Sequence, residues 1–226
     1  MKKSLINFIS NIGIMNQNIL HDINVTGVSM NSNLVDEGNI FVAIKGLNSD
    51  GHDFIDQAID SGASAIVTNG RDFGSLSVPQ IKVKDTRRAL SAIAAEYYGR
   101  PSNDLIVIGI TGTNGKTTTA TLTKAILDNA GYKTAQIGTI GLIADGVNHE
   151  QTMTTPDAIS IQKILHNLKE ESFTHVVMEV SSHALDQSRV ADINFNLAAF
   201  TNLSPEHLDL SLIHISEPTR PLYISY

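Results

Sequence analysis

Residues 105–118 read Leu-Ile-Val-Ile-Gly-Ile-Thr-Gly-Thr-Asn-Gly-Lys-Thr-Thr, and this stretch decides the fold class. Its first seven residues form the kind of apolar run that makes a strand buried on both faces of a parallel sheet. The glycines that follow predict a turn, and apolar residues spaced by three and four predict a helix over 117–130. Strand, glycine turn and helix in this order form one unit of an α/β fold.

The same alternation continues downstream. We expect strands over residues 134–140, 174–180 and 197–201, and a helix over 157–168. Strands that alternate with helices predict right-handed crossovers and a doubly wound parallel sheet. This second part of the chain is therefore expected to be an α/β nucleotide-binding domain.

The region upstream predicts a smaller α/β domain. Short β-prone pieces fill residues 23–45, and strands are expected at 65–68 and 81–83. Helices are expected at 53–61 and at 86–98, where Gly99 and Pro101 end the second one. We therefore divide the chain into an N-terminal domain (1–99) and a central domain (100–209).

Composition excludes several classes of protein. With 16 basic and 23 acidic residues the net charge is −7, which argues against a nucleic-acid partner. No apolar run reaches the ~18 residues of a membrane span, and the start has no signal-peptide cleavage pattern. We expect a cytoplasmic monomer. Because the chain has no cysteine, a metal must bind oxygen or imidazole ligands, and Mg²⁺ suits them best.

Residues 210–226 show neither the helical nor the strand spacing of apolar residues, and they contain Pro218 and Pro221. They could be a loose C-terminal extension. Residues 211–221 also resemble a translated sequencing adapter, and we favour the hypothesis that the tail is not native. We therefore expect no functional role for these residues.

The strongest chemical signal is the loop between the strand at 105–111 and its helix. Glycines let backbone N–H groups converge on phosphate, a lysine can reach the β- and γ-phosphates, and a threonine hydroxyl can bind Mg²⁺. Ile110 replaces the first glycine of the strict P-loop pattern, which implies a shorter variant loop. A simple glycine turn with an incidental lysine is the weaker interpretation. The candidate ATP-binding residues are Gly112, Thr113, Asn114, Gly115, Lys116, Thr117 and Thr118.

Two further strand ends carry metal-ligand candidates. Glu179 ends an apolar strand at the sheet edge where α/β proteins bind ligands, so it could hold Mg²⁺. A solvated glutamate at a strand end is the alternative. His207 follows the last expected strand and could bind a second metal, although a lone histidine is more often a surface residue.

Other polar residues near these strand ends have two interpretations each. Thr155 and Pro156 predict a helix start in which Thr155 is the N-cap, although the same N–H groups could serve an anionic substrate. Arg189, close to Gln187, could pair with phosphate or carboxylate oxygens or could be an ordinary surface charge.

These segments resemble the Mur ligase family of peptidoglycan synthesis over residues 25–209. The matching motifs are I-T-G-T-N-G-K-T-T-T at 110–119, T-T-P at 154–156, E-V-S-S-H-A-L at 179–185 and T-N-L-S-P-E-H-L-D at 201–209. The S-S-H form resembles the branch that adds a diamino acid, meso-diaminopimelate or L-lysine, to UDP-N-acetylmuramoyl-L-alanyl-D-glutamate. Of the two we favour meso-diaminopimelate.

The resemblance implies roles for specific residues. Lys116 and Thr117 would serve ATP and Mg²⁺, and Glu179 and His207 would hold Mg²⁺. The N-terminal domain would bind the UDP end of the substrate through Ser32, although the usual D-S-R is N-S-N at 31–33. The UDP-sugar site would be lined by Thr154, Thr155, Ser181, Gln187 and Arg189.

The implied chemistry is phosphorylation of the substrate carboxylate by ATP, followed by attack of the incoming amine. The family's carbamoylated lysine and third domain are not found in these residues, so the chain alone is expected to be inactive. Two alternatives are a different carboxylate-amine ligase, such as another Mur ligase or a folylpolyglutamate synthetase, and a nucleotide-binding switch without a ligase step.

Overall fold

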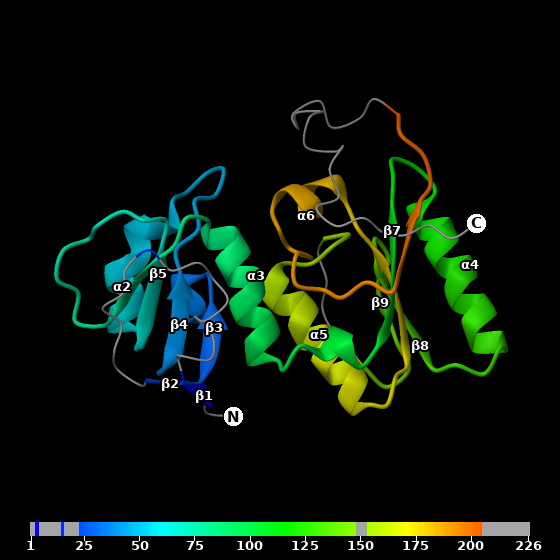
Figure 1. Ribbon diagram of the computed structural model, residues 1–226, viewed down its shortest axis with the longest axis horizontal. Helices are drawn as coiled ribbons and strands as arrows, with labels where there is room; N and C mark the ends of the chain where they lie inside the picture. The colour runs from blue at the N-terminus through cyan, green and yellow to red at the C-terminus, as the bar shows by residue number, and fades with distance from the viewer. Residues whose placement is uncertain (1–2, 5–14, 16–22, 148–152, 205–226) are drawn as a thin grey trace. The chain divides into compact units, whose positions relative to one another are not determined.

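The computed structural model describes residues 3–4, 15, 23–147 and 153–204. The chain divides into two compact units, Met1–Gly99 and Arg100–Tyr226, and each is described by itself (Figure 1). Both units contain parallel strands and helices, so the predicted α/β class is confirmed.

The first unit is built on a four-stranded parallel sheet in the order β3-β4-β5-β6. Two helices flank this sheet on opposite sides in Figure 1, α2 and α3. The expected strand at 65–68 and the helix that begins at residue 86 are confirmed. The bounds are β3 (Gly27–Ser29), β4 (Asn39–Val42), β5 (Ala65–Thr68), β6 (Gln80–Lys82), α2 (Ile55–Asp60) and α3 (Thr86–Tyr97). A separate two-stranded antiparallel sheet joins β1 (Lys3–Ser4) to β2 (Asn24–Val25), and two short 3₁₀ helices in the described part of this unit are η1 (Ser32–Leu34) and η2 (Gly51–Phe54). A third, η3 (Pro101–Asn103), belongs to the second unit.

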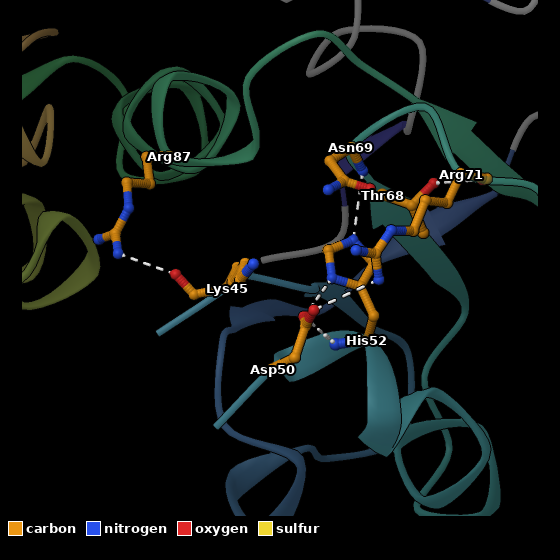
Figure 2. A network of polar contacts seen from close by, with 7 residues as sticks. All are labelled: Lys45, Asp50, His52, Thr68, Asn69, Arg71 and Arg87. Atoms are coloured by element: carbon orange, nitrogen blue, oxygen red, sulfur yellow. Dashed lines mark hydrogen bonds and ion pairs between the residues drawn. The ribbon is translucent and has the colours of Figure 1, made fainter. Parts of the chain in front are cut away.

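A buried histidine on η2 contacts the residue that follows β5 in this unit (Figure 2). The ring of His52 lies 2.5 Å from Asp50 through Nδ1, and its Nε2 accepts from the backbone N–H of Asn69 at 3.3 Å. Asp50 also pairs with Arg71, 3.3 Å away. The hydrogen bond from His52 lowers the pKa of Asp50 below its usual value. The loop at residues 45–50 is therefore fixed at its base, where Lys45 and Asp50 form an antiparallel bridge.

The second unit contains a five-stranded sheet in the order β11-β7-β10-β8-β9. Four strands are parallel, and only β9 runs antiparallel, beside β8. Their bounds are β7 (Ile106–Thr111), β8 (Thr134–Gly138), β9 (Gly141–Ile143), β10 (His175–Glu179) and β11 (Leu197–Phe200). The helices are α4 (Lys116–Asn129), α5 (Ala158–Glu170) and α6 (Ser182–Asp186).

Helices α4 and α5 cover opposite faces of this sheet, as Figure 1 shows. Alternate residues of a strand point to opposite faces, so Val176 and Met178 of β10 pack with α5, whereas Val177 packs with α4. The α5 side holds the larger core, in which Ile161 and Leu165 are fully buried. A doubly wound arrangement, as expected from the alternating pattern, therefore positions the strand ends.

Two expectations about this sheet were wrong. Strand β7 is not buried on both faces throughout, because Ile106 at its start is 42% exposed. The strand expected at 134–140 ends at Gly138, and the chain reverses through a turn in which Gly141 has a φ of 91°. This turn creates the antiparallel strand β9 and moves Thr139 out of the sheet.

In the part of the chain that the structure describes, no helix has both the length and the apolar character needed to cross a membrane.

Candidate functional site

The candidate site lies at the carboxyl ends of the parallel strands in the second unit. Strands β7, β8, β10 and β11 run in the same direction, so the loops that follow them emerge at one edge of the sheet. This is the edge at which open α/β sheets bind ligands. The chain order also reverses here, because β10 and β11 lie on the two sides of β7.

The glycine loop after β7 takes a conformation that requires glycine. Gly112 has a φ of 128° and Gly115 a φ of 84°, both in the region that L side chains rarely adopt. A Cβ atom on Gly112 would lie 2.2 Å from the Thr201 hydroxyl oxygen and 2.8 Å from the Asn202 carbonyl oxygen. The loop is therefore packed directly against the segment that follows β11.

This packing uses two of the amides that the sequence offers to phosphate. The N–H of Thr113 donates to the Asn202 carbonyl at 2.9 Å, and the N–H of Asn114 donates to the Asn202 side chain at 3.0 Å. Residues 115–118 form the N-cap and first turn of α4, where backbone N–H groups lack intrahelical acceptors. A phosphate would therefore meet the start of the helix rather than the whole loop.

Lys116 folds back over the loop. Its Nζ donates to the carbonyl oxygens of Gly112 at 2.7 Å and of Thr113 at 2.9 Å. Both acceptors are neutral, so an anion at the cavity would be a stronger partner for the ammonium group. Lys116 is thus held at the cavity wall by two hydrogen bonds to carbonyl oxygens, and phosphate oxygens could replace these carbonyls as its partners.

Glu179, the last residue of β10, is fully buried, which excludes the solvated interpretation of this residue. Its carboxylate accepts from Thr117 Oγ1 at 2.9 Å, Thr139 Oγ1 at 3.1 Å and the N–H of Thr139 at 3.1 Å. Within the described residues, no lysine, arginine or histidine forms an ion pair with it. A buried carboxylate without a cation is costly unless one binds there.

These groups line an open cavity of about 310 Å³. Its wall contains the loop from Thr113 to Thr118 together with Thr139 and Glu179. The lining is mainly polar hydroxyls and backbone, with one lysine and one carboxylate. Such a lining suits a phosphate chain better than an apolar ligand.

The donor set also fits Mg²⁺. The ion usually keeps several waters and binds proteins through one or two carboxylates in addition to substrate phosphates. Glu179 supplies one carboxylate, and Thr117 supplies a hydroxyl next to it. In the described part of the chain, no group of three or more histidine, aspartate or glutamate side chains could hold a metal alone. The site therefore suits an ion that arrives with phosphates.

A second group of polar residues, around Thr155 and Ser181, contacts the backbone of Glu179. Thr155 is buried, and its hydroxyl donates to the Glu179 carbonyl at 2.9 Å and accepts from the N–H of Ser181 at 3.0 Å. The Ser181 hydroxyl in turn caps α6 by accepting from the N–H of Ala184 at 3.2 Å. Thr155 and Ser181 are thereby brought together with the end of β10.

Arg189 ties this cluster to residues 153–155. Its guanidinium donates to the Thr155 carbonyl at 2.8 Å and makes two contacts with Gln187 Oε1, at 3.1 and 2.7 Å. It also lies 3.2 Å from the sulfur of Met153. The alternative of an ordinary surface charge therefore does not describe Arg189.

The helix cap expected at Thr155 was wrong. Helix α5 begins at Ala158, and its N-cap is Asp157, whose carboxylate accepts from the N–H groups of Ile159 and Ser160. Thr155 is not available as a cap because its hydroxyl is engaged by Glu179 and Ser181. The Thr155 hydroxyl is thus bonded to the end of β10 instead of the helix, and the Thr154 hydroxyl lies 3.2 Å from that of Thr139.

Ser32 lies in the first unit, on η1, and is buried. Its hydroxyl donates to Gln57 Oε1 at 2.9 Å, and the Gln57 amide donates to Asn33 at 2.8 Å. Asn31 caps η1. The asparagines at 31 and 33 therefore have structural partners here. The remaining candidate, His207, lies outside the described residues.

Sequence reasoning missed Thr139, which makes two of the three side-chain and backbone contacts to the Glu179 carboxylate. The sequence placed it inside a strand as an ordinary β-branched residue. Gly138 and Gly141, which flank it, were the available signal for a turn.

Comparison with known proteins identifies the family to which both units are similar. Residues 24–98 match the model "Mur ligase family, catalytic domain", and residues 110–214 match "Mur ligase middle domain". The second match includes the first residues of the segment for which a non-native origin is expected. Together the two matches cover most of the chain.

Individual relatives agree with these matches. The chain is 44% identical, over 205 residues, to a UDP-N-acetylmuramoyl-L-alanyl-D-glutamate–2,6-diaminopimelate ligase from Syntrophomonas wolfei subsp. wolfei; this covers 91% of the chain and 42% of the relative. A solved structure of a ligase with the same name superposes with a TM-score of 0.77 at 26% identity, covering 95% of this chain and 43% of the other. The chain therefore spans less than half of the length of these relatives.

A more distant solved structure contains a nucleotide. The MurF ligase from Thermotoga maritima in complex with ADP superposes with a TM-score of 0.52 at 26% identity, covering 77% of this chain and 37% of the other.

Proposed function

Since the chain belongs to the Mur ligase family, we propose that it is part of an ATP-dependent ligase that extends UDP-N-acetylmuramoyl-L-alanyl-D-glutamate with a diamino acid. The names of the relatives support 2,6-diaminopimelate as that amino acid, and we propose its meso form. The product would be a precursor of peptidoglycan, made in the cytoplasm.

The cavity beside Glu179 would take the phosphates of ATP. The first turn of α4 presents N–H groups, and Lys116 would exchange its two carbonyl partners for phosphate oxygens. Glu179 and Thr117 would hold Mg²⁺, which would neutralise charge on the phosphates during transfer. His207 is proposed as a ligand of a second metal on the strength of the family resemblance alone.

The cluster next to this cavity would position the carboxylate that ATP phosphorylates. Thr154, Thr155, Ser181, Gln187 and Arg189 are proposed to face the UDP-sugar and peptide, and Ser32 to serve the UDP end. The phosphorylated carboxylate is an acyl phosphate, and the amine of the diamino acid would displace its phosphate to form the amide. Held dipoles and cations lower the barrier for such charged steps.

One observation carries this proposal. The hydroxyl of Thr117, in the first turn of α4, lies 2.9 Å from the carboxylate of Glu179, at the end of a different strand. A buried acid and a P-loop hydroxyl in contact form half of a magnesium site that nucleotide phosphates would complete.

The test compares two lysines of helix α4 in the full-length protein to which this chain belongs. Lys116→Ala removes the ammonium group at the cavity, whereas Lys124→Ala removes one that pairs with Asp128 at 2.6 Å on the same helix. ATP consumption dependent on the UDP-linked substrate and on the diamino acid is measured. We expect Lys116→Ala to lower it by about 100-fold or more and Lys124→Ala to leave it nearly unchanged.

Equal ATP consumption by the Lys116→Ala variant and the unaltered protein would refute the proposal. Thermal protection separates the ligase from a nucleotide switch: the UDP-linked dipeptide should raise the melting temperature of a ligase, whereas a switch responds only to ATP or GTP. The 226-residue chain alone should show no turnover, because it spans less than half of the length of the ligases that it matches.

A further inference from the structure

Thr139 contacts both the buried acid of the nucleotide cavity and the threonine pair beside it. Its backbone N–H donates to Glu179 Oε1 at 3.1 Å, and its hydroxyl lies 3.1 Å from Oε2 and 3.2 Å from the hydroxyl of Thr154. Thr139 also lines the cavity. No other residue in the described part of the chain makes two hydrogen bonds to this carboxylate.

The direction of these hydrogen bonds follows from proton counting. A threonine hydroxyl carries one proton, and the ionised carboxylate can only accept. Thr139 therefore donates to Glu179, and its oxygen accepts from Thr154. The three groups form a directed chain from Thr154 through Thr139 to Glu179.

The local backbone is arranged for this contact. Gly138 precedes Thr139, and a Cβ atom at this position would lie only 2.0 Å from Glu179 Oε1. The turn that follows depends on Gly141 in the left-handed region. The glycine at 138 leaves room for the carboxylate, so that the Thr139 N–H and hydroxyl can reach its two oxygens.

The other donor to Glu179 would itself touch the metal. Thr117 donates its single proton to Oε2 and keeps lone pairs through which its oxygen could bind the ion. Thr139, which is not a proposed metal ligand, would supply the other two hydrogen bonds that orient the carboxylate. A ligand carboxylate that lacks such partners binds metal more weakly.

We propose that Thr139 is a positioning residue that aims the Glu179 carboxylate at the nucleotide-bound metal and couples it to the Thr154 side of the site. The proposal rests on the proposed function, because it assumes a metal–nucleotide complex in this cavity. Thr139 lies outside the sequence motifs, and its positioning role is separate from the metal-binding roles proposed for Glu179 and Thr117.

The experiment measures ADP affinity by calorimetry with and without Mg²⁺, using the full-length protein. Thr139→Val keeps the shape and removes the hydroxyl, Thr139→Ser keeps the hydroxyl, and Thr123→Val on α4, outside the cavity lining, is the matched control. We expect Thr139→Val to reduce the Mg²⁺-dependent gain in affinity by about tenfold, the size of a hydrogen bond to a charged group. The serine variant and the control should stay within about twofold of the unaltered protein, and affinity without Mg²⁺ should not change.

Each other outcome is informative. An unchanged Mg²⁺-dependent gain in Thr139→Val, or an equal loss with and without Mg²⁺, overturns the positioning role. If Thr139→Val fails to fold, Thr154→Val provides the test, because it removes the hydroxyl that donates to Thr139; a gain unchanged from the unaltered protein would overturn the proposal. Failure of the proposed function looks different, since the UDP-linked dipeptide would then not raise the melting temperature of the unaltered protein, whatever its affinity for ADP.

Discussion

The hydroxyl oxygen of Thr117 lies 2.9 Å from the carboxylate of Glu179, although 62 positions separate the two residues in the chain. Thr117 belongs to the first turn of α4, and Glu179 is the last residue of β10. The parallel sheet brings them together because the carboxyl ends of β7 and β10 lie side by side. A fully buried acid thus meets the loop that would hold nucleotide phosphates.

The first prediction follows from the buried charge at this contact. Glu179→Gln keeps the shape of the side chain and removes its negative charge. Among the described residues, no cationic side chain forms an ion pair with Glu179. We expect thermal stability without metal to be equal or higher, because a buried unpaired charge opposes folding. The Mg²⁺-dependent affinity for ADP should fall by about tenfold or more. Differential scanning fluorimetry and calorimetry measure the two effects.

The surface variant Glu170→Gln on α5 is the control and should change neither quantity. A Glu179→Gln protein that is strongly destabilised and still binds ADP with full Mg²⁺ dependence would show that the carboxylate is structural.

The second prediction concerns the space beside the same carboxylate. Gly138→Ala would place a Cβ atom 2.0 Å from Glu179 Oε1, so one of the two must move. Overpacking of this kind costs about 1–3 kcal/mol of unfolding free energy. We expect urea denaturation to show a loss in this range together with weaker binding of ADP and Mg²⁺.

A double mutant identifies the cause. In a Glu179→Ala background the clashing oxygen is absent, so Gly138→Ala should cost clearly less than in the unaltered protein. Equal costs in both backgrounds would mean that the backbone at residue 138, and not the carboxylate, is responsible.

Much of this arrangement could be predicted from local patterns. The strands at 65–68 and 175–179 and the helices that begin at 86 and 116 follow from apolar periodicity and turn residues, which are properties of neighbouring positions. The motif at 112–118 also lies where it was expected, between a strand and a helix. The proposed roles of these residues remain predictions.

The remainder depends on contacts between distant segments. Thr155 has the sequence context of an N-cap, yet its hydroxyl is taken by Glu179 and Ser181, and Asp157 caps the helix instead. Thr139 fits a strand by residue type, yet the pairing of β9 with β8 turns it towards the carboxylate. No local pattern contains these partners, so the sequence alone could not identify either role.

The third prediction concerns Asp50 in the first unit. The hydrogen bond from His52 holds the pKa of Asp50 below its ordinary value of 3.8. The ionised form is therefore favoured by folding, so its contribution is complete above that ordinary value and is lost as the pH falls through the lower folded pKa. Asp50→Asn should lower the melting temperature by a few degrees, about 2–5 °C, at pH 7, and the difference should shrink below pH 3.8.

Asp56→Asn on α2 is the matched control, because Asp56 is exposed. The opposite result is a difference in melting temperature between Asp50→Asn and the unaltered protein that stays constant as the pH falls to about 3, below the ordinary aspartate pKa. It would contradict the assignment of the stabilising contact to the ionised form of Asp50.

The last prediction concerns His175, at the start of β10. Its ring packs against Tyr132 with 4.3 Å between ring centroids, and burial lowers its pKa below the ordinary value of 6.5. The unfolded chain therefore binds this proton more readily than the folded chain does, so stability is complete above pH 6.5 and falls as the pH is lowered through that value. His175→Phe keeps a ring beside Tyr132 and removes the titrating group. Urea unfolding should give similar stabilities for the two proteins above about pH 7, where an ordinary histidine is neutral. On acidification the variant should lose less stability than the unaltered protein. Parallel pH profiles of the two proteins would show that His175 does not contribute to the acid sensitivity of this unit.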